Sequence, residues 1–102
     1  MKTTSLDVDA MRAAAEDAAA LLRTLGNVDR LMLLCQLTEG EHCVSELEEA
    51  TGILQPSLSQ QLGVLRNMEL VDTRREGKNI YYRIADPRAL KILKTVHDLY
   101  CR

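Results

Sequence analysis

Three cysteines are the most chemically reactive side chains in this sequence. Cys35, Cys43 and Cys101 are odd in number and widely spaced, which argues against the disulfide framework of a small secreted protein. In a reducing cytosol they are thiols, so a bond between any two of them would be a regulated event. Thiolates also bind soft metal ions, and His42 and His97 are further possible ligands, so metal binding is a second possibility.

A segment without charge indicates a different chemistry, which is hydrogen bonding. Residues 50–65, ATGILQPSLSQQLGVL, contain no charged side chain, although 27% of the chain is charged. In a helix, Leu58, Leu62 and Leu65 lie on one face at i, i+4 and i+7, and Gln60 points the opposite way. The segment therefore predicts a core face opposite a neutral face rich in Ser and Gln.

Length and composition fit one small domain, residues 1–102. Hydrophobic residues make up 46%, but Phe and Trp are absent, so the core must be aliphatic. A core of this size gains from the burial of further surface, which favours a homodimer. The N-terminus lacks the apolar region of a secretory signal, and no apolar run is long enough to span a bilayer. We therefore expect a cytoplasmic protein with no membrane partner.

The charge is unevenly distributed along the chain. Residues 1–54 contain four Lys/Arg and ten Asp/Glu, which gives −6, whereas residues 55–102 contain nine and five, which gives +4. The two halves together give the net charge of −2. An acidic N-terminal half and a basic C-terminal half create a directional electrostatic field, which affects the choice of binding partner rather than the fold.

The first half of the chain predicts three helices. An Ala-rich segment at 9–25 has high helix propensity, and Asn27 can cap an apolar second helix that ends at Gly40. Ser45 and Glu48 have the spacing of a capping box at the start of a short third helix.

The second half predicts a helix, a hairpin and a last helix. Pro56 suits the first position of the fourth helix. Two runs of period-2 alternation then flank a charged loop, residues 74–79, and predict a β-hairpin over 70–85. Asp86 and Pro87 begin a helix that extends to position 101. This order defines a mainly α fold with a β-hairpin wing, the winged helix-turn-helix.

This arrangement predicts binding to double-stranded DNA. The short helix, turn and amphipathic helix over 45–68 match a helix-turn-helix, whose second helix enters the major groove. There, Gln pairs with adenine edges and Ser with several bases, while basic residues of the wing contact phosphates. The candidate DNA-binding residues are Gln55, Ser57, Ser59, Gln60, Arg66, Arg74, Arg75, Lys78 and Asn79, with Arg83 as a further cation.

The sequence resembles the ArsR/SmtB family of winged-helix repressors over nearly its whole length. The similar stretches are LGNVDRLMLLCQL, VSELEEATGILQPSLSQQLGVLRNMELVDTRREGKNIYYRI and the closing helix. The resemblance implies a homodimer joined through helices at 9–25 and 87–101. It also implies a palindromic operator with half-sites about one DNA turn apart, from which a ligand or a redox change releases the protein.

Within the family, LMLLCQL and LYC are similar to the persulfide-responsive branch. That resemblance implies that Cys35 and Cys101 form a dithiol that senses reactive sulfur species or oxidants. Lys94, His97 and Arg102 are neighbours that would favour the reactive thiolate.

Three other classes of function are weighed against this interpretation. Metal-sensing members carry Cys-Val-Cys where this chain has Cys43-Val44-Ser45, so a metal-responsive repressor is a weaker alternative and no metal or other cofactor is predicted. A winged-helix protein-interaction module is another alternative, but the basic wing and the Ser/Gln face favour DNA as the partner. The chain has no glycine-rich phosphate loop and no paired-carboxylate pocket, so we expect no catalytic activity.

Overall fold

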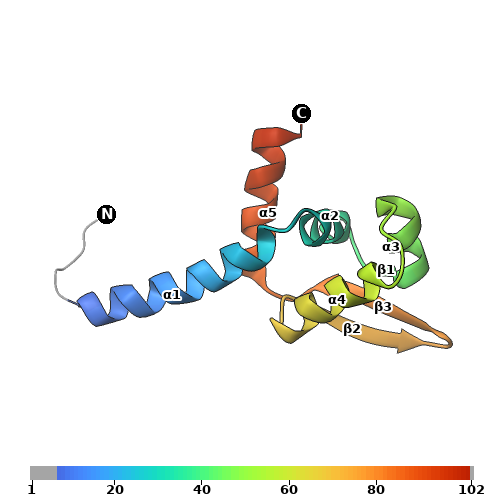
Figure 1. Ribbon diagram of the computed structural model, residues 1–102, viewed down its shortest axis with the longest axis horizontal. Helices are drawn as coiled ribbons and strands as arrows, with labels where there is room; N and C mark the ends of the chain where they lie inside the picture. Colours follow the sequence, from blue (N-terminus) through green and yellow to red (C-terminus); the bar gives the residue numbers. More distant parts are fainter. Residues whose placement is uncertain (1–6, 102) are drawn as a thin grey trace.

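The computed structural model describes residues 7–101 of the chain (Figure 1). Its elements, in chain order, are α1 (Val8–Leu25), α2 (Val28–Leu37), β1 (His42–Cys43), α3 (Val44–Thr51), α4 (Ser57–Asn67), β2 (Val71–Glu76), β3 (Asn79–Ile84) and α5 (Pro87–Tyr100). The predicted order of helices and hairpin is confirmed, and the fold is a mainly α winged helix. The sequence did not predict β1.

Polar side chains fix the starts of the helices. The Asn27 carboxamide oxygen accepts a hydrogen bond from the backbone N–H of Arg30 (3.0 Å), as expected for the cap of α2. The third helix begins earlier than predicted, because Glu46 Oε1 accepts from the Cys43 N–H (3.0 Å) and Cys43 is the cap. Ser45 therefore lies inside α3, and its predicted pairing with Glu48 is wrong.

The strands of the wing are longer than the sequence suggested. Strands β2 and β3 pair antiparallel from Val71 opposite Ile84 to Glu76 opposite Asn79. The predicted charged loop at 74–79 is thus mostly strand, and Gly77 and Lys78 form the turn between the two strands. Exposed charged side chains on both faces hide the period-2 signal there. Gly77 has φ of +62°, a conformation that glycine adopts without a steric penalty.

The third strand, β1, pairs with the other edge of β3 and gives the sheet order β1-β3-β2. His42 lies opposite Tyr82, and Cys43 lies opposite Tyr81. The base of the wing is therefore attached through β1 to the start of α3.

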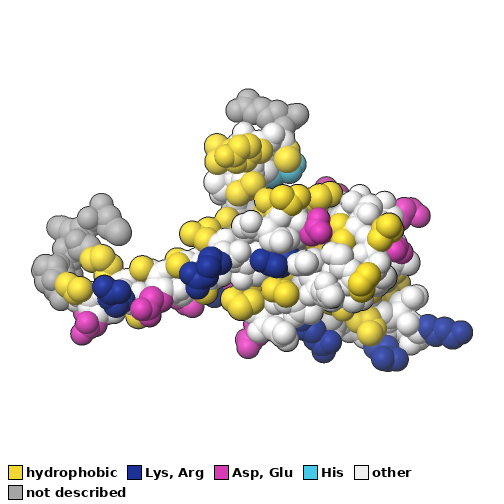
Figure 2. Space-filling model, viewed as in Figure 1, with side chains coloured by type: hydrophobic (Ala, Val, Ile, Leu, Met, Phe, Trp, Pro, Cys, Tyr) yellow, Lys and Arg dark blue, Asp and Glu magenta, His cyan; other side chains and the backbone are white. Residues whose placement is uncertain are grey.

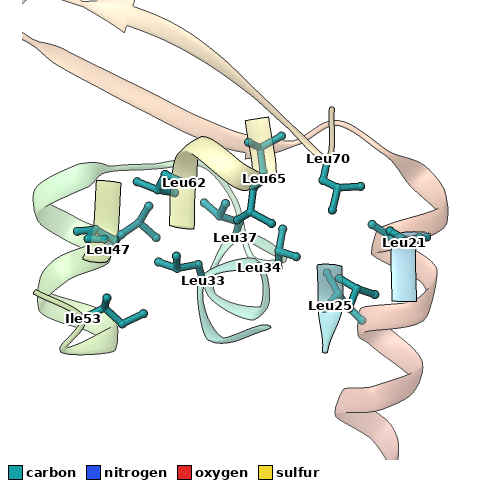
Figure 3. Packing of buried hydrophobic residues seen from close by; sticks show 14 residues of the cluster. Leu21, Leu25, Leu33, Leu34, Leu37, Leu47, Ile53, Leu62, Leu65 and Leu70 are labelled. Atoms are coloured by element: carbon teal, nitrogen blue, oxygen red, sulfur yellow. The ribbon is translucent and has the colours of Figure 1, made fainter. Parts of the chain in front are cut away.

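Leucines from all five helices form most of the core, together with Leu70 and Val71 at the start of the wing (Figure 3). Leu33 and Leu34 of α2 are completely buried, as are Leu47 of α3 and Leu58 of α4. The buried cluster is aliphatic, as predicted, and its members are Leu21, Leu25, Leu33, Leu34, Leu37, Leu47, Ile53, Leu58, Leu62, Leu65, Leu70, Val71, Ala89 and Leu93.

Two helices project from the body that this core holds together (Figure 1). Of the 18 residues of α1, only Leu21, Thr24 and Leu25 are buried, and α5 buries only Ala89 and Leu93. Figure 2 shows hydrophobic side chains along both projecting helices. Across residues 7–101, no helix combines the length and the apolar character needed to cross a membrane.

Candidate DNA interface and dithiol site

Helix α4 presents the two faces that its sequence predicts. Leu58, Leu62 and Leu65 are buried against α2 and the core, whereas Ser59 and Gln60 are exposed. Because the leucines fix the rotation of the helix about its axis, the neutral polar face must point outward. Ser57 is half-buried at the first turn.

The start of α4 is capped by a predicted DNA-binding residue. Gln55 Oε1 accepts a hydrogen bond from the Ser59 N–H (3.0 Å), which satisfies one of the free backbone donors at the helix N-terminus. Pro56 occupies the N-cap position, one residue before the predicted place. The Gln55 oxygen is therefore engaged with the helix, and its amide N–H₂ group is the part that remains for another partner.

A positioning contact that the sequence analysis missed holds α4 in place. Arg30 donates from Nε to the carbonyl oxygen of Thr24 (2.8 Å) and from Nη1 to Gln61 Oε1 (3.0 Å). This side chain joins the end of α1, the start of α2 and the middle of α4. Gln61 is three residues after Leu58 and four before Leu65, a spacing that places it on the inward face of α4. This spacing could have indicated from the sequence that Gln61 has a partner inside the protein.

The wing uses one of its predicted phosphate-binding residues for its own structure. Arg74 forms an ion pair with Glu41, donates to Glu76 Oε1 (2.7 Å) and lies 4.7 Å from the centre of the Tyr81 ring. The hydrogen bond from Arg74 lowers the pKa of the Glu41 carboxyl group. The two carboxylates neutralise Arg74 and attach the wing to the segment before β1.

The other cations that the sequence predicts to contact phosphates are free to bind a partner. Arg75, Lys78 and Arg66 are exposed, and within residues 7–101 none of them forms an ion pair. Asn79 is exposed at the first position of β3. Arg83 is 3.6 Å from Asp72 across the two strands. Figure 2 shows basic side chains along the edge of the molecule that carries the wing.

Two of the three cysteines share a hollow. Cys35 is half-buried on α2, Cys101 is exposed just after α5, and both line a hollow of about 590 Å³ between α2, α3 and α5. Both are free thiols. Cys43 is buried elsewhere, at the cap of α3, where its sulfur lies 3.3 Å from the Ser45 hydroxyl oxygen.

The surroundings of Cys35 favour its protonated form. Burial raises the pKa of the Cys35 thiol, and the negative charge of a Cys101 thiolate raises it further. The predicted promotion of a thiolate by basic neighbours is therefore wrong for Cys35. Lys94 and His97 lie near it, but Glu39 and Asp98 line the same surroundings, and Arg102 lies outside the described residues.

The described residues hold no group of three or more His, Cys, Asp or Glu side chains placed to bind one metal ion. His42 instead lies 3.4 Å from Glu46, at the start of α3, where Cys43 is the cap. His97 lies on α5, beside the hollow of Cys35 and Cys101.

A helix-turn-helix with an outward neutral face, followed by a wing that carries exposed cations, defines a winged-helix transcriptional regulator. Residues 27–73 match the family described as bacterial regulatory protein, arsR family. The chain belongs to the arsR family of DNA-binding regulators. Its relatives are regulators rather than enzymes, which confirms the expectation that the chain is not catalytic.

Three relatives illustrate the match. The chain is 47% identical over 96 residues to the biofilm growth-associated repressor of Agrobacterium fabrum, which covers 94% of this chain and 82% of the relative. The crystal structure of the transcriptional repressor BigR from Xylella fastidiosa superposes with a TM-score of 0.86 at 46% identity, and covers 92% of this chain and 96% of that one. Reduced HlyU from Vibrio cholerae superposes with a TM-score of 0.87 at 34% identity, over 90% and 97% of the two chains.

Proposed function

We propose that this protein is a homodimeric repressor that binds a palindromic operator and releases it when the Cys35–Cys101 dithiol reacts with reactive sulfur species or oxidants. The observation that carries the sensing part is that both thiols line one hollow between α2 and α5. Relatives named as repressors support the direction of regulation. The protein would act in the cytoplasm, where the operator is.

In the proposed complex, the outward face of α4 enters the major groove. Gln60 and Ser59 are exposed there and carry no charge, so they would form hydrogen bonds with base edges. Arg75 and Lys78 of the wing, together with Arg66 at the end of α4, would contact phosphates. Arg74 would support these contacts indirectly, because its cation is neutralised by Glu41 and Glu76.

The two kinds of contact are separable by mutation. We expect Arg75→Ala to weaken binding to all sequences alike and to reduce the slope of log K against log salt by roughly 2 for the dimer, about 0.9 for each lost phosphate contact. We expect Gln60→Ala to reduce discrimination between the operator and a substituted half-site by about 1–3 kcal/mol. Titrations of fluorescent duplexes at several salt concentrations measure both effects. A Gln60→Ala protein with unchanged affinity and specificity would show that the reading face is assigned wrongly.

The order of the thiol reactions follows from exposure. Cys101 is exposed and meets the reagent first, whereas Cys35 is half-buried with a raised pKa. With a persulfide R–S–SH, the Cys101 thiolate attacks the outer sulfur and expels R–S⁻, which takes up a proton. Cys35 sulfur then attacks the Cys101 sulfur and expels HS⁻. Two thiols and one persulfide thus give one disulfide, R–SH and H₂S; the cysteines lose two electrons, and the transferred sulfur gains them.

Cys35 is the second thiol to react. Burial is the main cause of its raised pKa, so it is less reactive than the exposed Cys101 toward a reagent in solution. The bond would join α5 to α2 across the hollow and change the position of α5 relative to the body.

The thiol mechanism is tested by three single variants. We expect sodium tetrasulfide to form an intramolecular Cys35–Cys101 link in the natural protein and to weaken operator binding about 5- to 150-fold, the usual range of allosteric coupling. Cys35→Ser and Cys101→Ser should stay bound to DNA after the same treatment. Cys43→Ser is the matched control and should respond fully, because Cys43 lies outside the hollow. Intact-mass measurement beside a DNA titration gives both readouts, and equal release from all three variants would remove the dithiol mechanism.

A further inference from the structure

The hollow that contains the two thiols is built at the ends of three helices. Gln36 and Glu39 lie at the end of α2, Ala50 and Thr51 at the end of α3, and Tyr100 and Cys101 at the end of α5. The free carbonyl groups of a helix C-terminus carry partial negative charge. Partial negative charge at three helix ends near the hollow disfavours an anion there.

The side chains strengthen this preference. Among residues 7–101, the lining contains one carboxylate, Glu39, one imidazole, His97, and neither Lys nor Arg. Much of the remaining wall is apolar, and it includes Leu31, Met32 and Val96. Met32 is 42% exposed, so its thioether chain is available to contact a guest molecule. The volume of about 590 Å³ lies within the range of small-molecule sites.

A second, smaller hollow also touches Cys35, and more charged side chains line it. It has a volume of about 300 Å³, and its lining includes Lys94, Asp98 and Thr38. Cys35 thus lies between two hollows, and only the larger one also contains Cys101. A reagent that is to meet both thiols must therefore enter the larger hollow.

We propose that this hollow binds uncharged organic polysulfides, R–S–S–S–R with apolar R groups, and presents an outer sulfur of their chain to Cys101. The inference rests on the proposed thiol switch and names the class of effector that the switch prefers. An anionic reagent such as glutathione trisulfide has the same sulfur chain, but it places carboxylates near Glu39 and three helix C-termini. A dialkyl trisulfide places alkyl groups against Leu31, Met32 and Val96 instead.

The reaction is balanced without a further oxidant. The Cys101 thiolate attacks an outer sulfur of the trisulfide, forms Cys101–S–S–R and expels R–S–S⁻. Cys35 sulfur then attacks the Cys101 sulfur and expels R–S⁻. Two thiols and one trisulfide give one disulfide, one R–S–SH and one R–SH, and the two protons of the cysteines pass to the two leaving groups.

The test compares dipropyl trisulfide with glutathione trisulfide. The rate of formation of the Cys35–Cys101 link is measured by intact mass on the natural protein, and each rate is divided by the rate of the same reagent with free cysteine. We expect the normalised ratio to favour dipropyl trisulfide by at least about tenfold, which corresponds to about 1.4 kcal/mol. A normalised ratio near one, or one that favours glutathione trisulfide, would overturn the proposal.

A pair of methionine variants locates the preference. We expect Met32→Gln to reduce the ratio at least threefold by slowing dipropyl trisulfide alone. Met68→Gln is the matched control; Met68 is exposed at the end of α4, outside the hollow, and the ratio should stay unchanged. An unchanged ratio in Met32→Gln would overturn the assignment to this hollow.

If tetrasulfide forms the link but neither trisulfide does, the effector class is wrong and the switch stands. If no sulfur donor forms the link, the switch itself is wrong.

Discussion

A protein with Met11→Glu and Leu22→Glu on α1 is expected to be a monomer and to bind its operator about 10²- to 10⁴-fold more weakly. In the proposed dimer, binding of one half-site holds the second copy of α4 near the other half-site. Linking two binding sites in this way raises the affinity by about 10²- to 10⁴-fold, which a monomer would lose. Met11 and Leu22 are 56% and 55% exposed, and both lie on the projecting helix. Two charged side chains per protomer would oppose the burial of this surface against a partner.

The physical argument is that α1 lacks partners of its own. An 18-residue helix is about 27 Å long, and most of the stability of a helix in a protein comes from packing of its apolar face. Leu99 and Tyr100 of α5 are also exposed, and Tyr100 has 81% of its surface free. A partner that covers both helices would bury these side chains, which supports the predicted roles of residues 9–25 and 87–101 as dimerisation helices.

Light scattering after size exclusion gives the mass of the double variant, and a fluorescent operator titration gives its affinity. Val28→Glu is the control, because Val28 is exposed at the start of α2 and lies on neither projecting helix. This control should keep the mass of a dimer. A double variant that remains dimeric would show that α1 is not the dimer interface.

Leu34→Ala is expected to lower the free energy of unfolding by about 3–5 kcal/mol, which is a large part of the roughly 5–15 kcal/mol typical of a domain. Leu34 is completely buried in α2, the central helix, and has leucines of other helices around it (Figure 3). Truncation would leave a cavity that the rigid helices could fill only in part. Urea unfolding followed by circular dichroism measures the loss.

Leu54→Ala is the matched control for this loss. Leu54 is exposed in the turn before α4, and its truncation should change the free energy by less than about 0.5 kcal/mol. If Leu34→Ala cost less than about 1 kcal/mol, the central position of α2 in the core would be contradicted.

Local sequence patterns predicted a helix or hairpin well where the element contains its own capping residues or its own hydrophobic periodicity. Asn27 and Asp86 cap α2 and α5 as expected, and the leucine spacing of α4 gave its orientation. The short strand β1 has two residues and therefore no period to detect. The early start of α3 depends on Glu46 bonding to Cys43, a less common cap than serine.

The candidate site was harder to predict, because it depends on contacts between distant positions. The ion pair of Arg74 with Glu41 joins residues 33 positions apart, so the sequence suggested a phosphate contact where the structure has an internal one. The Arg30–Gln61 hydrogen bond was missed for the same reason. The proposed pairing of Cys35 with Cys101 came from the family resemblance, since no local pattern relates the middle of α2 to the end of α5.

The engagement of Arg74 within the wing has a consequence for the bacterial cell. With Glu41 and Glu76 beside it, Arg74 displaces no counterion from the operator, so the proposed dimer would release roughly two fewer ions than its wing sequence suggests. Occupancy of the promoter would then change less when intracellular potassium rises during osmotic stress. The phosphate contacts proposed for Arg66, Arg75 and Lys78 would still leave the promoter sensitive to salt, but less so than a wing in which Arg74 also bound DNA.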